Sequence, residues 1–198
     1  EDKAEVYYSL GNLYRVQNNN EKASYYFKEA VKSRINHEDA LFQLAMITEE
    51  EGSFDEILDF YQEFIDQDPY SAGAWYNLGV VYNRLGRFED AIKAYDYAIL
   101  IDDAFASAYF NLGNALMNTQ QYELALEAYQ NTINCEGANA ENCCYMGAAY
   151  EKLEKIDEAF KYFKKSAKFD EEYDDAWFGL GMCMLKKEKF FEAIHYFK

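Results

Sequence analysis

The sequence repeats itself every 34 residues, and this period constrains the possible fold more than any other feature. A leucine followed by a glycine marks most copies, and no residue is inserted or lost between copies. The leucine position holds Leu10, Leu44, Leu78, Leu112, Met146 and Leu180, and the next position holds Gly11, Ala45, Gly79, Gly113, Gly147 and Gly181. Such self-similarity is the signature of a repeat architecture, in which each copy packs against its neighbours.

The third copy, residues 72–103, shows what a single repeat folds into. Four of its residues are spaced so that they share one face of a helix, and they are Trp75, Leu78, Gly79 and Tyr82. Gly86 then interrupts the pattern, and a second apolar face follows, made of Phe88, Ala91, Ile92, Tyr95, Ala98 and Ile99. The stretch predicts two helices joined by a tight turn. One such hairpin cannot bury both of its apolar faces, so it needs neighbours of its own kind.

Three more positions keep the same period. An early aromatic position holds Tyr7, Leu41, Trp75, Tyr109, Cys143 and Trp177, an alanine position holds Ala23, Ile57, Ala91, Ala125, Ala159 and Ala193, and a ring position holds Phe27, Tyr61, Tyr95, Tyr129, Phe163 and Phe197. The set resembles the tetratricopeptide repeat, whose signature combines Trp, Leu-Gly, Tyr, Ala, Phe and Pro on a 34-residue period. The signature proline survives at Pro69 and is replaced by Ile35, Asp103, Gly137 and Glu171 elsewhere.

The resemblance implies an all-α fold, a right-handed superhelical solenoid of antiparallel helix hairpins. We interpret residues 1–198 as a single array with repeats at about 4–37, 38–71, 72–105, 106–139 and 140–173, followed by an incomplete repeat at 174–198. The second repeat departs most from the pattern, because Ala45 replaces the glycine, Ile57 replaces the alanine, and Phe64 stands where the neighbouring repeats carry Ala30 and Ala98. We expect the smaller Leu41 to compensate in the packing; the alternative is a local change of curvature.

The charge of the chain limits its partners. Nineteen basic residues stand against 36 acidic ones, which gives a net charge of −17. Nucleic acids and anionic membrane surfaces both require clustered Lys and Arg, so neither is an expected partner. The acidity favours a basic or neutral protein partner, although it also serves to keep an aromatic-rich solenoid in solution. No apolar run reaches the length that crosses a membrane.

The cysteines and the chain ends give weaker indications. Cys143 stands at the early aromatic position, where a reduced cysteine acts as a small apolar residue, and we expect all four cysteines to be reduced, which favours the cytoplasm. The chain starts at Glu1 rather than Met, which leaves open a missing N-terminus. The sixth repeat stops at Lys198 with apolar residues on its second helix. We therefore expect a fragment of a longer protein, or an end that packs on another surface.

No group of residues predicts catalysis, a metal site or a cofactor. His37 and His195 are the only histidines, and neither has cysteines or carboxylates at a metal-ligand spacing. The glycines recur with the repeat and do not form a phosphate-binding loop. We therefore predict neither an enzyme nor a protein with a bound cofactor.

The resemblance implies a concave groove lined by the first helix of each repeat. The expected peptide-binding residues are Tyr8, Asn12, Phe42, Gln43, Tyr76, Asn77, Val80, Phe110, Asn111, Asn114, Tyr145 and Phe178. Amide side chains offer a donor and an acceptor, which match the backbone of an extended peptide. A ladder of Gln43, Asn77 and Asn111 could therefore hold a peptide backbone while the aromatic residues select side chains. The alternative is that both sets serve packing.

Some members of this family bind the C-terminal carboxylate of chaperone tails through Lys, Asn, Asn, Lys and Arg. The matching positions here are Tyr8, Asn12, Gln43, Gly73 and Asn77, so the cations are missing and this class of partner is not expected. The sequence predicts a scaffold or adaptor that binds an extended peptide or a helix in its groove. The alternative is a substrate-recruiting or regulatory repeat domain of an enzyme whose catalytic part lies outside this chain.

Overall fold

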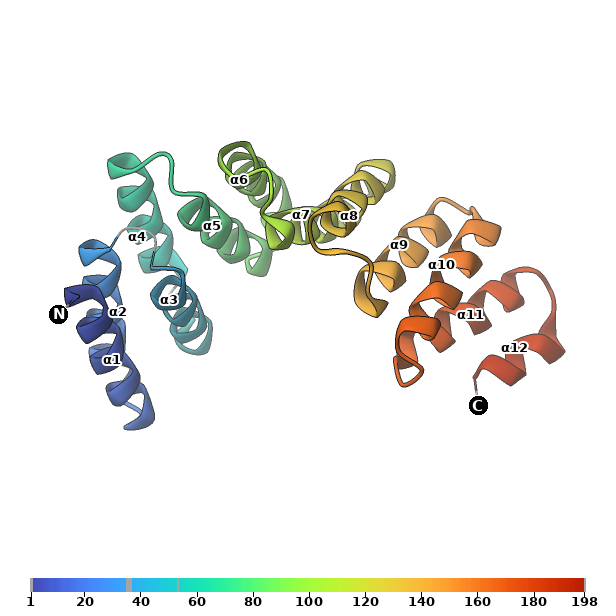
Figure 1. Cartoon of the computed structure of the whole chain (residues 1–198), viewed down its shortest axis with the longest axis horizontal. Coiled ribbons are helices and arrows are strands. Elements are labelled where there is room, and N and C mark those ends of the chain that lie inside the picture. Colours follow the sequence, from blue (N-terminus) through green and yellow to red (C-terminus); the bar gives the residue numbers. More distant parts are fainter. Residues whose placement is uncertain (1, 35–36, 53, 198) are drawn as a thin grey trace. The chain divides into compact units, whose positions relative to one another are not determined.

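The computed structural model describes residues 2–34, 37–52 and 54–197. Within these residues it contains helices and no strand, which confirms the all-α prediction (Figure 1). The helices are α1 (Lys3–Val16), α2 (Asn20–Ser33), α3 (Glu38–Glu51), α4 (Phe54–Gln67), α5 (Ala72–Arg84), α6 (Phe88–Ile101), α7 (Ala106–Asn118), α8 (Tyr122–Glu136), α9 (Ala140–Lys152), α10 (Ile156–Phe169), α11 (Asp174–Lys186) and α12 (Phe190–Tyr196). Ile35 and the side chain of Ala45 lie outside the described part.

The chain divides into two compact units, Glu1–Asp103 with helices α1 to α6 and Ala104–Lys198 with helices α7 to α12. In each unit, consecutive helices pair as antiparallel hairpins (Figure 1). We call the odd-numbered helix of each hairpin the first helix and the even-numbered one the second helix. From α3 on, the first helices begin 34 residues apart. The right-handed superhelix of one continuous array stays a prediction.

Five of the described hairpins are closed by a ring that lies against a glycine. A Cβ atom placed on Gly11, Gly79, Gly113, Gly147 or Gly181 would come within 2.4–2.8 Å of a ring carbon of Phe27, Tyr95, Tyr129, Phe163 or Phe197, respectively. Real Cβ atoms do not approach other atoms so closely. The glycine of the first helix therefore makes room for the ring of the second helix, and this explains why the two positions recur together in the sequence.

The second hairpin seals its core differently. Its ring residue, Tyr61, is fully buried, and its hydroxyl donates a hydrogen bond of 2.9 Å to the carbonyl of Leu41 in α3. Leu41 and Phe64 are both buried in the core of the first unit. Both residues are thus accommodated in the core of this unit, and the compensation of Phe64 by Leu41 stays a prediction.

Two tryptophans fix the turns between hairpins. The indole N–H of Trp75 donates to the carbonyl of Pro69 at 3.0 Å, and that of Trp177 donates to the carbonyl of Glu171 at 2.8 Å. Pro69 and Glu171 occupy the same position of the repeat. The hydrogen bond therefore holds this turn with or without the signature proline.

The turn inside every hairpin uses one residue in the left-handed region. The φ angles are 56° at Asn18, 67° at Gly52, 71° at Gly86, 61° at Gln120, 59° at Glu154 and 58° at Glu188. These six residues occupy the same position of the repeat. Only glycine adopts this conformation without steric cost, so three of the hairpins carry a strained glutamine or glutamate there.

Replacing one of these strained residues should stabilise the chain. We expect Glu154→Gly to raise the free energy of unfolding by about 1 kcal/mol and Gly86→Ala to lower it by about as much, because a Cβ is disfavoured at positive φ. Urea denaturation measures both effects. Glu158→Gly in the first turn of α10 is the control and should lower stability. A loss of stability with Glu154→Gly would contradict this account of the turn.

The contact between ring and glycine makes a second prediction. In Gly113→Ala, the new Cβ would lie 2.4 Å from Cε1 of Tyr129, whose ring is fully buried. The hydroxyl of Tyr129 is also held by Asn114 Oδ1 at 2.8 Å, so the ring cannot easily move. We expect thermal unfolding to show a loss of about 1–2 kcal/mol. Ser107→Ala, an exposed position of the same helix, should be neutral or slightly stabilising; equal stability of the two variants would contradict the packing account.

Candidate binding surface

The residues predicted to bind a peptide all lie on first helices. We call the surface that they form within one unit the first-helix face of that unit. In the first unit it comprises Tyr8, Asn12, Phe42, Gln43, Tyr76, Asn77 and Val80, and in the second unit Phe110, Asn111, Asn114, Tyr145 and Phe178. The structure brings α3 and α5 side by side in the first unit and α9 and α11 side by side in the second.

Several of the predicted amide side chains take part in the fold itself. Asn77 is only 6% exposed, and its Nδ2 donates a hydrogen bond of 2.8 Å to the carbonyl of Gly73, one turn earlier in α5. The Oδ1 of Asn114 accepts the hydroxyl of the buried ring Tyr129. Gln43 is half-buried on α3. The ladder of Gln43, Asn77 and Asn111 as a peptide-binding device stays a prediction, and Asn77 has little surface to offer to it.

Aromatic side chains are the more accessible part of the face. Phe42 on α3 is 57% exposed, and Phe178 on α11 is 60% exposed. The other predicted rings pack partly against the fold. Tyr8 lies 5.8 Å from Phe27, Tyr76 lies 6.0 Å from Tyr95, and Phe110 meets Tyr145 edge to face at 4.9 Å, all measured between ring centroids.

Phe178 stands between two hollows of the second unit. One hollow, of 270 Å³, lies between α9 and α11 and is lined on its apolar side by Tyr145, Ala148, Phe163, Phe178, Gly179 and Met182. Its other lining residues are Cys144, Tyr173, Glu151 and Asp175. We call it the α9–α11 hollow. Two carboxylates therefore border an otherwise apolar space.

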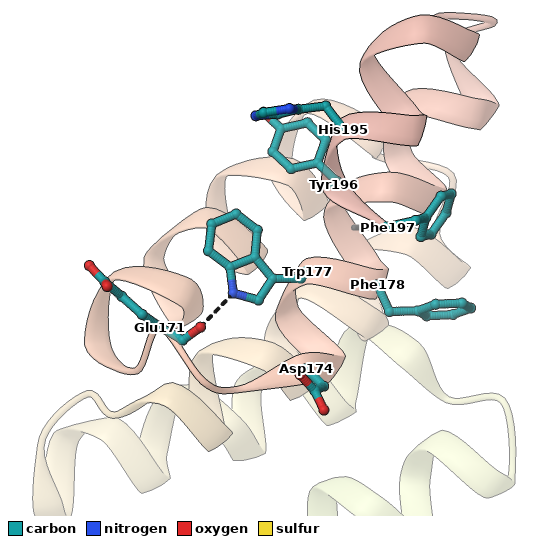
Figure 2. Close-up of a pocket in the computed structure, with 7 residues that line it drawn as sticks. All are labelled: Glu171, Asp174, Trp177, Phe178, His195, Tyr196 and Phe197. Carbon is teal, nitrogen blue, oxygen red and sulfur yellow. Dashed lines mark hydrogen bonds between the residues drawn. The ribbon is translucent and has the colours of Figure 1, made fainter.

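The other hollow, of 610 Å³, lies between α11 and α12 and is lined by Glu171, Asp174, Trp177, Phe178, His195, Tyr196 and Phe197. In Figure 2 the indole of Trp177 lies between Glu171 and Tyr196, while Phe178 and Phe197 project from the other side of the two helices. The rings of Trp177 and Tyr196 stack at 6.3 Å, and those of Phe178 and Phe197 are 5.8 Å apart. This hollow is larger than the α9–α11 hollow, and its lining consists of aromatic and polar side chains.

The environment of the α9–α11 hollow keeps the Cys144 thiol and the Tyr173 hydroxyl neutral. Burial raises the pKa of the Cys144 thiol to about 12, and the charge of Asp175 acts in the same direction. Burial, with Cys144, Glu141 and Asp175 nearby, likewise raises the pKa of Tyr173 to about 12. The thiol therefore lines the hollow as a small apolar group and not as a nucleophile.

Glu151 and Asp175 differ in their pairing. A carboxylate oxygen of Glu151 lies 3.0 Å from the Nζ atom of Lys186. Asp175 is exposed, and it has no ion-pair partner in the part of the chain that the structure describes. The uncompensated negative charge at the border of this hollow is therefore that of Asp175.

The described residues hold no group of three or more His, Cys, Asp and Glu side chains that could bind a metal ion. In the same residues, no helix is both long enough and apolar enough to span a membrane. No catalytic domain is evident in the described part of the chain.

Sequence reasoning selected Tyr145 and Phe178 but missed the residues that open the α9–α11 hollow. Ala148 and Gly179 occupy positions that carry larger side chains in most other repeats, such as Val80 and Asn77. The sequence signal is a small residue at two positions of the repeat that carry larger side chains elsewhere. The repeat pattern shows Trp177 only as a member of the early aromatic column, whereas its ring also lines the hollow between α11 and α12.

Comparisons with known proteins agree on the architecture. Four models described as "Tetratricopeptide repeat" match residues 8–72, 72–105, 106–137 and 140–173. No curated protein matches the sequence.

Several solved structures resemble the chain. A MamA protein is 27% identical, with 86% of this chain and 93% of that chain covered and a TM-score of 0.68. YrrB, described as a TPR protein with an unusual peptide-binding site, is 21% identical, with coverages of 86% and 88% and a TM-score of 0.69. PilF of Pseudomonas aeruginosa is 18% identical, with coverages of 98% and 88% and a TM-score of 0.75. The last two likenesses concern the fold alone.

The buried thiols of the second unit predict how stability depends on pH. Burial raises the pKa of Cys144 to about 12 and that of Cys183 to about 11, from an ordinary value of 9.0. The unfolded chain therefore loses these protons first, and the stability that they contribute is present below pH 9 and lost as the pH rises toward these values. We expect the free energy of unfolding to fall above pH 9 by up to about 1.4 kcal/mol per pH unit for each thiol.

Urea denaturation under reducing conditions between about pH 8.5 and 9.5 measures this slope, at a pH where most tyrosine and lysine side chains are still protonated. The double variant Cys144→Ala with Cys183→Ala should show a clearly shallower slope. Cys135→Ala is the matched control, because this cysteine is exposed and its replacement should leave the slope unchanged. An unaltered slope in the double variant would show that the buried thiols do not carry the effect.

Proposed function

Because the chain belongs to the tetratricopeptide repeat family, whose domains are generally protein-interaction modules, we propose that it binds a segment of a partner protein on its first-helix faces. The observation that carries this proposal is the exposure of Phe178 between two hollows. A large aromatic side chain that is exposed to solvent next to a hollow is typical of an interaction site. The description of YrrB as having a peptide-binding site supports this reading by analogy with the same fold.

The first unit offers a second stretch of the same kind of surface. Phe42 occupies the position of the repeat that Phe178 occupies in α11, and both rings are more than half exposed. Phe42 lies on α3, which packs beside α5, where Tyr76 and Val80 are half-buried. The same column of the repeat therefore carries an accessible ring in both units, and each unit can hold a segment of a partner by itself.

The partner that suits these faces is a neutral or basic segment. The net charge of −17 disfavours acidic ligands through long-range repulsion. Selectivity would come from aromatic contacts, which bury a large area with few rotatable bonds. The amides of Asn77 and Asn114 are engaged within the fold, so we assign the main binding contribution to the rings.

Removing an exposed ring of the face should weaken binding without unfolding the chain. Peptides are first selected on the immobilised chain from a random-sequence display library, and their affinities are then measured by fluorescence anisotropy. We expect Phe42→Ala or Phe178→Ala to weaken at least one class of selected peptides by about tenfold, the loss of one buried aromatic contact. Thermal stability should change little, because both rings are largely exposed.

Phe169→Ala is the matched control. This ring lies on the second helix α10 and is 51% exposed, so it removes similar apolar surface outside the first-helix face. The proposal predicts unchanged affinity for this variant. If all three variants bind the selected peptides equally well, the first-helix faces are not the binding surface.

A further inference from the structure

The proposed function does not define the amino-acid sequence of the partner segment, and the lining of the α9–α11 hollow indicates which side chains it can bind. We propose that this hollow anchors one bulky aliphatic or aromatic side chain of a partner segment whose adjacent residue is lysine or arginine. This inference rests on the proposed function, since it assigns a ligand class to one part of the first-helix face of the second unit.

The hollow exists because Phe163 occupies the space beneath α11. A Cβ atom placed on Gly179 would lie 2.5 Å from Cδ1 and Cε1 of Phe163, and one placed on Gly147 would lie 2.8 Å from Cδ1 of the same ring. The ring is therefore clamped between glycines of two successive first helices, α9 and α11. Gly179 can carry no side chain into the face, where Tyr145 extends from the same position of α9.

A second small residue widens the opening. The position of Ala148 in α9 is occupied by Val80 in α5 and by Met182 in α11. The two small residues, Ala148 and Gly179, lie on neighbouring helices and line one hollow. The exposed ring of Phe178 and the half-buried Met182 also line this hollow and present apolar surface to whatever enters it.

The volume suits one side chain. Pockets for drug-sized ligands and cofactors generally measure about 300–1,000 Å³ and enclose most of the ligand. The α9–α11 hollow measures 270 Å³, below this range. Its lining is apolar apart from the carboxylates, the tyrosine hydroxyls and a protonated thiol, so it offers mainly apolar contacts to an incoming leucine, isoleucine or phenylalanine.

The charge at its border selects a cation. Asp175 lines the hollow, is exposed, and has no ion-pair partner among the described residues, while Glu151 is paired with Lys186. The negative charges of Asp175 and Glu141 also raise the pKa of Tyr145, after the larger effect of burial. A lysine or arginine next to the anchoring side chain would lie beside Asp175, whereas a carboxylate there would be repelled.

The test uses three synthetic nonapeptides of glycine and serine whose centres are Arg-Leu-Arg, Arg-Ala-Arg and Glu-Leu-Glu. Each is titrated into the isotope-labelled full chain, and the amide and methyl signals are followed by NMR, which detects weak binding. We expect the Arg-Leu-Arg peptide to shift the signals of Ala148 and Gly179 saturably. The Arg-Ala-Arg peptide should bind about tenfold or more weakly, because the anchor has lost most of its apolar surface.

Two variants test whether the peptide binds in the α9–α11 hollow. Ala148→Met fills it with a side chain that Met182 already carries at the same position of the repeat, so the fold should tolerate it, and binding of the Arg-Leu-Arg peptide should fall about tenfold or more. Asp175→Lys should weaken the same peptide roughly threefold or more, with a smaller difference at high salt. Glu158→Lys is the matched control, since it makes the same change of charge at an exposed position in the first turn of α10, which lines neither hollow.

The outcomes separate this inference from the proposed function. Loss of binding in Ala148→Met and Asp175→Lys, with the control unaffected, supports the inference. If the peptide shifts other signals of the first-helix faces and its affinity is unchanged by Ala148→Met, the inference is overturned while the proposed function stands. Equal binding of the Glu-Leu-Glu and Arg-Leu-Arg peptides overturns the charge selection. If no peptide shifts any signal of the hollow, the inference is wrong, whatever the ring variants of the preceding test show.

Discussion

The contact between a glycine of each first helix and an aromatic ring of its second helix is the interaction on which the structure depends. In five of the six described hairpins the ring lies within 2.8 Å of where a Cβ atom would be, so the two helices approach closely. Four of these rings are buried, and Phe197 at the end of the chain is partly exposed. This single steric relation explains the Leu-Gly marker, the ring column and the period that joins them. Each hairpin still exposes apolar surface, which the next hairpin covers.

The candidate site arises where one aromatic ring makes this contact with two glycines. Phe163 is the ring that lies against a second glycine, Gly179, on the first helix of the next hairpin. Because the ring leaves no room for a Cβ atom at position 179, the first-helix face carries no side chain there, and the α9–α11 hollow lies beside Phe178. Packing and recognition are therefore linked: the residue that tightens the core between α10 and α11 is also the one that opens the surface.

The sequence predicted the fold well because its signal is periodic, and one face of a helix follows from spacing alone. It predicted the site less completely for a physical reason. Periodicity places Asn77 beside a groove, but it does not show that the side chain turns back to the carbonyl of Gly73 with 6% of its surface exposed. Equally, it records Gly179 and Ala148 only as small residues, whereas the hollow depends on the position of Phe163 beneath them.

The central claim is that an apolar side chain of a partner segment lies in the α9–α11 hollow. Intermolecular NOE measurement on the chain with labelled alanine methyl groups, bound to the peptide centred on Arg-Leu-Arg, tests it most directly. The account predicts NOEs between the leucine methyls of the peptide and the methyl of Ala148, and none to the methyl of Ala128, which is buried in α8. A bound peptide whose leucine shows NOEs to other alanines but not to Ala148 would contradict the account.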